Sequence, residues 1–307
     1  MHKLPNVTAD FVWMDGELVP WKDAKVHILT HAMHYGTSAF EGIRVYPVGD
    51  QMYVFRLQEH MKRLSDSCKI YGIDLKYSVE EMCRSAVETV RKNKLHSRSY
   101  IRPIVYVGFG GIGINFTGFP VGVSILAFPF EKYLHGEGVN VIVSSWRRMN
   151  DQTSTSLGKI GGQYTNSVLA KVESVRNGYD EAIMLDQNGH VSEGTGENIF
   201  LVRNGRLITP PLSSSILEGI TRDSIFKIAS NLGIQVIERA IPRSELYIAD
   251  EVFFSGTAAE VTPIFTIDKK KVGDGDIGPL TSKIKEAFMK VVSGDDQRYS
   301  SWLTPVY

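Results

Sequence analysis

The stretch Ser156-Leu-Gly-Lys-Ile-Gly-Gly162 closes a Gly- and Ser-rich segment, residues 150–162, whose pattern fits neither a helix nor a strand. The residues before it, 139–146, have the apolar composition of a strand, and residues 163–177 after it are predicted to form a helix. Irregular segments between regular elements are where binding and catalytic residues concentrate. The sequence therefore predicts a functional loop, and this loop contains one lysine, Lys159.

Lys159 lies between glycines and has no acidic neighbour close in sequence that would pair with its ammonium group. The glycines allow the backbone to approach another group closely. Schiff-base chemistry uses the unprotonated amine, which an apolar or cationic environment favours. On spacing alone, an ordinary exposed loop lysine explains the same residues, so both interpretations stay open at this point.

The regions on both sides of this loop mix strands and helices without regular alternation. Asp15-Gly16 between two short apolar runs predicts a hairpin at residues 11–19. Further strands are predicted at 42–46, 52–55, 100–107, 121–128, 181–186, 190–193, 198–202, 206–208 and 251–254, and helices at 58–71, 79–93, 220–232 and 281–292. This pattern indicates an α+β fold in two domains, residues 1–130 and 139–307, joined by a polar interdomain loop at 131–138.

Length and composition limit the possible classes of protein. The 307 residues suffice for two domains that each bury a core, and 34 basic residues balance 34 acidic ones. A nucleic-acid binder would carry a basic surplus, so we expect no nucleic-acid partner. The longest apolar run, residues 121–130, is too short to span a membrane, and the N-terminus lacks the apolar core of a secretory signal. With only two cysteines, a reducing, cytoplasmic location is expected.

Two patterns suggest other kinds of site. Gly108-Phe-Gly-Gly-Ile-Gly113 matches GxGxxG, but a dinucleotide site needs a helix that opens at the third glycine, and residues 114–120 cannot form one. A glycine-rich loop between strands is therefore expected. His27, His31 and His34 are close in sequence, but no carboxylate or cysteine cluster completes a set of about three or four ligands, so we predict no metal site.

Several long motifs in a fixed order identify a family. They are Gly158-Lys-Ile-Gly-Gly-Gln-Tyr164, Val191-Ser-Glu-Gly-Thr-Gly-Glu-Asn-Ile-Phe200, Ser255-Gly-Thr-Ala-Ala-Glu-Val-Thr-Pro263, His34-Tyr-Gly-Thr-Ser-Ala-Phe-Glu-Gly-Ile-Arg44 and Tyr100-Ile-Arg-Pro103. With them the chain resembles, nearly end to end, the fold-type IV pyridoxal-phosphate enzymes, and the last two motifs resemble the branched-chain aminotransferases. The resemblance implies two α/β domains with pyridoxal 5′-phosphate at their interface, and a homodimer or homohexamer.

The resemblance also implies a role for each cofactor-binding residue. Lys159 would hold the cofactor as a Schiff base and then move the proton between the substrate Cα and the cofactor C4′. Glu193 would pair with the pyridine nitrogen and keep it protonated. Tyr164 would bind the phenolic oxygen. The phosphate would be bound by Arg63, Ile220, Thr221 and Thr257.

The substrate residues follow from the same resemblance. One pocket must accept an aliphatic side chain in one half-reaction and the glutamate γ-carboxylate in the other. Tyr35, Phe40, Val107 and Tyr133 would line it, Arg102 with the hydroxyls of Tyr35 and Tyr133 would bind the γ-carboxylate, and Tyr100, Thr257 and Ala258 would contact the α-carboxylate.

The implied reaction is amino transfer from L-leucine, L-isoleucine or L-valine to 2-oxoglutarate, in ping-pong order through the pyridoxamine form of the cofactor. The alternatives are a D-amino acid aminotransferase or an aminodeoxychorismate lyase of the same fold, and a non-catalytic binding protein on the same scaffold. Residues 40–44 and 100–103 argue against the first two.

Overall fold

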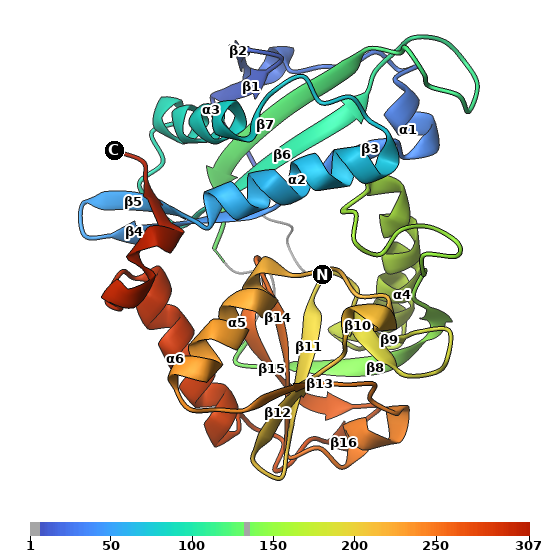
Figure 1. The fold of residues 1–307 in the computed structure, drawn as a ribbon, viewed down its shortest axis with the longest axis vertical. Helices are drawn as coiled ribbons and strands as arrows, with labels where there is room; N and C mark the ends of the chain where they lie inside the picture. The colour runs from blue at the N-terminus through green and yellow to red at the C-terminus, as the bar shows by residue number, and fades with distance from the viewer. Residues whose placement is uncertain (1–6, 132–135) are drawn as a thin grey trace. The chain divides into compact units, whose positions relative to one another are not determined.

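The computed structural model describes residues 7–131 and 136–307. The chain divides into two compact units. Unit 1 comprises Met1–Glu131, Gly158–Gly162 and Val291–Tyr307, and unit 2 comprises Lys132–Leu157 and Gln163–Lys290. Each unit combines a large sheet with helices (Figure 1), which confirms the α+β prediction.

Unit 1 contains an antiparallel sheet in the order β17-β5-β4-β6-β7-β1-β2, with β3 paired to β6 outside this path. Its strands are β1 (Phe11–Met14), β2 (Glu17–Pro20), β3 (Ser38–Phe40), β4 (Ile43–Val48), β5 (Gln51–Phe55), β6 (Ser99–Val107), β7 (Val121–Pro129) and β17 (Leu303–Pro305). Its helices are α1 (His31–Tyr35), α2 (Leu57–Tyr71) and α3 (Val79–Lys92).

The local sequence explains these elements. Asp15 and Gly16 both adopt positive φ, 49° and 104°, as a tight hairpin turn requires, and β1 pairs with β2 as predicted. Ser78 caps α3 in a capping box with Glu81. Helices α2 and α3 bury Met61, Met82 and other apolar residues in one core with the sheet.

Unit 2 contains a mixed sheet in the order β10-β9-β8-β15-β14-β11-β12-β13, with β16 paired to β15. Its strands are β8 (Val139–Arg147), β9 (Glu181–Leu185), β10 (Val191–Gly194), β11 (Asn198–Arg203), β12 (Arg206–Thr209), β13 (Val236–Glu238), β14 (Glu251–Gly256), β15 (Glu260–Ile267) and β16 (Lys270–Lys271). Its helices are α4 (Tyr164–Arg176), α5 (Ile220–Asn231) and most of α6 (Pro279–Val292). The tight antiparallel connections predicted for β9–β10 and β11–β12 are confirmed.

Candidate active site

In unit 1 the backbone of Lys159 is fixed on both sides. Its N–H donates to Ser67 Oγ on α2 at 2.9 Å, and its carbonyl accepts from Phe40 N at 3.1 Å. The next residue, Ile160, is fully buried in the unit 1 core and forms a bridge with Ala39. The side chain is half-buried, with Nζ 4.9 Å from the centroid of the Phe40 ring. Lys159 therefore sits on a rigid support although its segment has no regular structure.

Glycines make this close packing possible. A Cβ on Gly161 would lie 2.3 Å from Ser38 Oγ, and one on Gly36 would lie 2.5 Å from the Cα of Gly162. Gly162 N also donates to the Gly36 carbonyl at 2.9 Å. The glycines that flank the lysine thus allow two backbones to touch, as the sequence predicted.

Arg63 on α2 is held by Glu41, a fully buried carboxylate at the end of β3. Arg63 Nε donates to one carboxylate oxygen at 2.6 Å and Nη2 to the other at 2.9 Å, which is a bidentate pair. His60 Nδ1 lies 2.8 Å from Glu41 Oε2, and Gly42 N donates to the same oxygen at 3.2 Å.

The charge state of this group follows from its surroundings. Burial alone would raise the pKa of Glu41, but Arg63 and His60 outweigh it and hold the pKa well below the usual range. Burial lowers the pKa of His60, against the opposing effect of Glu41. The group is therefore an ionised carboxylate between a guanidinium and a neutral imidazole, and it fixes the plane of the Arg63 guanidinium.

Phe40, Tyr100 and Arg102 lie together in unit 1. The Arg102 guanidinium carbon is 4.9 Å from the Phe40 ring centroid and 5.3 Å from that of Tyr100, and Nη2 donates to the Tyr100 hydroxyl at 3.1 Å. Arg102 Nε is buried and has no hydrogen-bond partner among the described residues. A Cβ on Gly42 would lie 1.8 Å from the Tyr100 hydroxyl oxygen, so only glycine admits this ring. The cluster combines aromatic surface with a cationic donor.

Two of the other residues predicted to line the substrate pocket, Tyr35 and Val107, have different neighbours in unit 1. Tyr35, at the end of α1, is 42% exposed and packs against the His31 ring at 4.4 Å between centroids. Val107 is fully buried in the core, and its N–H donates to the Thr37 carbonyl. Tyr133 lies outside the described residues.

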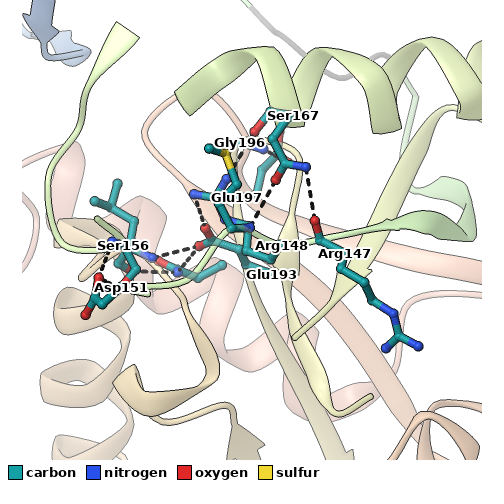
Figure 2. Close-up of polar contacts among 12 residues, drawn as sticks. Arg147, Arg148, Asp151, Ser156, Ser167, Glu193, Gly196 and Glu197 are labelled. Carbon is teal, nitrogen blue, oxygen red and sulfur yellow. Dashed lines mark hydrogen bonds and ion pairs between the residues drawn. The ribbon is translucent and has the colours of Figure 1, made fainter. Parts of the chain in front are cut away.

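In unit 2, Glu193 on β10 is buried and surrounded by donors (Figure 2). Arg148 Nη2 contacts one carboxylate oxygen at 2.8 Å. Asn198 Nδ2 and Leu217 N donate to the other at 3.0 and 3.1 Å. Three donors of this kind stabilise the ionised carboxylate and fix its orientation.

The Glu193 network continues to the N-terminus of α5. Asn198 Nδ2 also donates to the Leu217 carbonyl at 2.9 Å, which ties β11 to the segment that leads into the helix. The N-cap residue is Gly219, where a Cβ would lie 1.9 Å from Asn198 Oδ1. Ile220 and Thr221 are the first two residues of the helix and are both buried. The N-terminus of such a helix favours an anion.

The remaining predicted residues of unit 2 lie at element ends. Tyr164 is the first residue of α4 and is half-buried. Thr257 and Ala258 are half-buried in the turn that joins β14 to β15. Ends of strands and helices are positions where a rigid scaffold presents side chains and backbone N–H groups.

The two patterns that suggested other sites have structural explanations. Residues 108–113 form a loop between β6 and β7, as expected. His31 is buried, with ring nitrogens 2.7 Å from Thr37 Oγ1 and 2.8 Å from the Gly113 carbonyl. His34 Nε2 lies 3.0 Å from the Ile28 carbonyl. These histidines tie α1 to its neighbouring loops.

Comparison with known proteins gives the class. Residues 38–267 match the amino-transferase class IV family, and the chain belongs to that family. It is therefore a pyridoxal phosphate-dependent transferase.

Its relatives are more specific. The chain is 48% identical over 303 residues to the branched-chain-amino-acid aminotransferase of Salmonella typhimurium, covering 97% of this chain and 98% of that one. The branched-chain aminotransferase of Thermoproteus uzoniensis, solved with norvaline, is 49% identical with a TM-score of 0.95, covering 98% of this chain and 100% of that one. A branched-chain amino acid aminotransferase from T.th., complexed with N-(5′-phosphopyridoxyl)-L-glutamate, is 42% identical, with the same TM-score and coverage.

Within residues 7–131 and 136–307, every helix is too short or too polar to cross a membrane.

Sequence reasoning missed the residues that hold the predicted ones in place. Glu41 and Asn198 lie within the family motifs at residues 34–44 and 191–200. Their presence as polar residues within a motif was the signal that could have identified them. Arg148 follows β8 in a polar run and gave no such signal. Arg148 contacts Glu193, which lies 45 residues further along the chain. A local sequence pattern does not encode such a contact.

Proposed function

We propose that the chain transfers the amino group of L-leucine, L-isoleucine or L-valine to 2-oxoglutarate, giving the branched 2-oxo acid and L-glutamate in ping-pong order. The names of its relatives and the norvaline and phosphopyridoxyl-glutamate ligands of its structural neighbours support the proposal. The observation that carries it is Glu193, a buried carboxyl group whose two oxygens are contacted by Arg148, Asn198 Nδ2 and Leu217 N.

The donors and charges of unit 2 fit the cofactor. Pyridoxal 5′-phosphate supplies a ring that withdraws electrons from the substrate Cα and carries the amino group between substrates. An ionised Glu193 would accept a hydrogen bond from a protonated ring nitrogen and keep the proton there. The N-terminus of α5 at Ile220 and Thr221 would bind the phosphate, together with Thr257. Tyr164 would donate to the phenolic oxygen.

In unit 1, Lys159 would hold the cofactor through its side-chain amine and would afterwards move the proton at the substrate Cα. Its fixed backbone supports this role, because a general base must stay within hydrogen-bond reach of the proton that it removes. Arg63 binds the phosphate with a guanidinium whose plane Glu41 fixes.

The same unit provides the elements of dual substrate recognition. The aromatic rings of Phe40 and Tyr100 offer apolar surface for an aliphatic side chain, and Arg102 between them offers a cation for the γ-carboxylate of glutamate. Its buried Nε, which lacks a partner among the described residues, is a donor that an acceptor from the substrate would satisfy. We also propose that Tyr35, Val107 and Tyr133 line this pocket, and that Tyr100, Thr257 and Ala258 contact the α-carboxylate.

Substitution of Lys159 tests the proposal. We expect Lys159→Ala to lower the turnover of L-leucine with 2-oxoglutarate by more than about 10³-fold, because the covalent attachment and the general base are lost together. Lys62→Ala, which removes an exposed lysine paired with Asp66, serves as the control and should retain activity. Borohydride reduction of the wild-type holoenzyme should place the cofactor on the peptide that contains Lys159. Near-normal turnover in Lys159→Ala, or an adduct on another residue, would contradict the assignment.

A donor panel separates this function from its alternatives. L-leucine, L-isoleucine, L-valine and D-alanine are each offered with 2-oxoglutarate. Turnover of the D-substrate alone would identify a D-amino acid aminotransferase. A protein that shows no cofactor absorbance band after incubation with pyridoxal 5′-phosphate would be a non-catalytic member of the fold.

We further propose that the chain forms a homodimer or homohexamer. Unit 1 exposes several large apolar side chains: Val26, Ile28, Met33, Phe109, Ile112 and Ile114. Two of them, Val26 and Met33, line a largely apolar cavity of about 330 Å³ against β6 and β7. Exposed apolar side chains beside an apolar cavity are typical of an interaction surface. The cytoplasm is the proposed location, since Cys68 and Cys83 are both unpaired and a reducing compartment preserves thiols.

A further inference from the structure

Unit 2 contains three buried glutamates and two cationic side chains, Arg148 and Lys171, that pair with two of them. Glu193 pairs with Arg148 at 2.8 Å, and Glu181 pairs with Lys171 at 2.7 Å. The third carboxyl group belongs to Glu197, which forms no ion pair among the described residues. If all three carboxyl groups were ionised, this part of the structure would carry one uncompensated negative charge.

The side chain of Glu197 is enclosed, and the hydrogen bond that it accepts comes from a neutral backbone group. It is 6% exposed, and Oε2 accepts from Gly196 N at 3.1 Å (Figure 2). A Cβ on Gly194 would lie 2.7 Å from this oxygen, so the carboxyl group occupies space that a side chain at position 194 would take. A single N–H in a buried site compensates an ionised carboxylate poorly.

The neighbouring groups show why the proton stays on Glu197. Glu181 on β9 is fully buried. Its carboxylate accepts hydrogen bonds from Lys171 Nζ on α4, from Thr195 Oγ1 at 2.7 Å and from the Ala182 N–H at 2.8 Å. Glu193 on β10 has Arg148 and two further donors. From β14, Phe254 contributes a neutral side chain beside the same turn.

The electrostatics agree with this geometry. Burial, followed by the negative charges of Glu181 and Glu193, raises the pKa of Glu197 to about 8, although Gly196 N and Lys171 act in the opposite direction. A carboxyl group in such a setting changes its charge near neutral pH, where an ordinary glutamate is fully ionised.

We propose that Glu197 is a positioning residue for Glu193: it is held as the neutral acid, and loss of its proton at alkaline pH adds a negative charge that strengthens the hold of Glu193 on a protonated ring nitrogen. The inference rests on the proposed role of Glu193 toward the cofactor. Within the chain, Glu197 acts as a pH-dependent charge that sets the proton affinity of the ring nitrogen.

The first experiment follows the ring nitrogen directly. Holoenzyme is loaded with pyridoxal 5′-phosphate labelled with ¹⁵N in the ring, and its chemical shift is recorded from about pH 6 to about pH 10. We expect the wild type to show a step in this chemical shift over the pH range in which Glu197 loses its proton, because the new negative charge strengthens the hydrogen bond between Glu193 and the protonated ring nitrogen. Glu197→Gln keeps the shape of a neutral acid but carries no titrating proton, so this step should be absent.

Two further variants test the electrostatic cause. Glu181→Gln removes a negative charge that opposes ionisation of Glu197, so the step should move to lower pH. Glu251→Gln is the matched control, because Glu251 is a buried glutamate of the same unit that accepts from Leu280 N, Thr281 N and Thr281 Oγ1. It should leave the step unchanged. An identical step in the wild type and in Glu197→Gln would overturn the proposal.

The second experiment needs no cofactor and separates this inference from the proposed function. Because the folded protein binds the Glu197 proton more tightly than the unfolded chain does, the contribution of Glu197 to the free energy of unfolding falls as pH rises from about 4.5 to about 8 and does not change further above that. We measure the free energy of unfolding of the cofactor-free protein in urea at several pH values. In Glu197→Gln the plot of this free energy against pH should lack the downward slope that corresponds to one proton. Equal slopes would show that Glu197 is ionised in the folded protein. If the slopes differ but the protein binds no pyridoxal 5′-phosphate, the buried acid stands and the proposed function fails.

Discussion

Glu41 holds Arg63, the residue proposed to bind the cofactor phosphate. Its carboxylate accepts two hydrogen bonds from Arg63, one from Gly42 N and one from the His60 ring. Without it, the Arg63 side chain would keep its charge but lose the fixed plane that suits it to bidentate recognition of a phosphate.

We therefore predict that Glu41→Gln weakens the binding of pyridoxal 5′-phosphate by about 10- to 100-fold, the value of a hydrogen bond to a charged group. Pyridoxal, which lacks the phosphate, should bind the variant and the wild type equally. Titration of the absorbance band of bound cofactor measures both affinities.

Glu59→Gln is the control, since Glu59 lies on the same helix as Arg63, has a 41% exposed side chain and pairs with the N-cap residue Arg56. It should change neither affinity, because Glu59 pairs with Arg56, whereas Arg63 pairs with Glu41. An equal loss of affinity for pyridoxal and for its phosphate in Glu41→Gln would mean that Glu41 supports the fold of the site generally and not Arg63 in particular.

Among the elements, α5 depends on a glycine at its start. Gly219 lies so close to Asn198 that a methyl group at this position would displace the amide that holds Glu193. The N-terminus of the helix and the buried carboxylate are thus one structural feature.

We predict that Gly219→Ala weakens binding of both pyridoxal and pyridoxal 5′-phosphate, because it disturbs the Glu193 network as well as the helix N-terminus. Gly233→Ala, just beyond the other end of the same helix, is the control. Its Cβ would meet nothing within 4 Å, but its φ of +70° makes the substitution strained, so we expect a stability loss of about 1 kcal/mol without loss of affinity. Unchanged affinity in Gly219→Ala would contradict the link to Asn198.

Elements with a clear repeating pattern could be predicted from the sequence, and those without one could not. Helices α2, α3, α4 and α5 lie within about two residues of their predicted ends. Strand β15 was not predicted, because Pro263 interrupts its apolar run. In the structure Pro263 nevertheless lies opposite Phe253 of β14 inside the sheet. Strand β17 has three residues and no pattern of its own, and it forms only because β5 offers an edge.

The site follows the same rule. The glycines around Lys159 predicted a close approach of two backbone segments, because few other features call for glycine at such positions. The role of the lysine was predicted from the family motif. Asn198 and Arg148 act through distant contacts, which sequence spacing does not express. The roles assigned to the site residues stay predictions.

For the whole molecule, we predict that light scattering gives a mass that is a multiple of 34.3 kDa. Met33→Glu places a charge at the apolar cavity of unit 1 that Met33 lines and should shift the mass toward that of one chain. Ile248→Glu, at an exposed apolar residue of unit 2, is the control and should leave the mass unchanged. A wild-type mass of 34.3 kDa would exclude the oligomer.

The path of the chain through the two units affects how the protein is made. Ile160 and Val306 both belong to the core of unit 1, although most of that unit is formed by residues 1–131 and most of the chain between these two residues belongs to unit 2. A ribosome therefore releases residues 1–131 long before their core is complete. The domain begun first is finished last, and during synthesis its unfilled core would be exposed to chaperones and proteases until Val306 emerges.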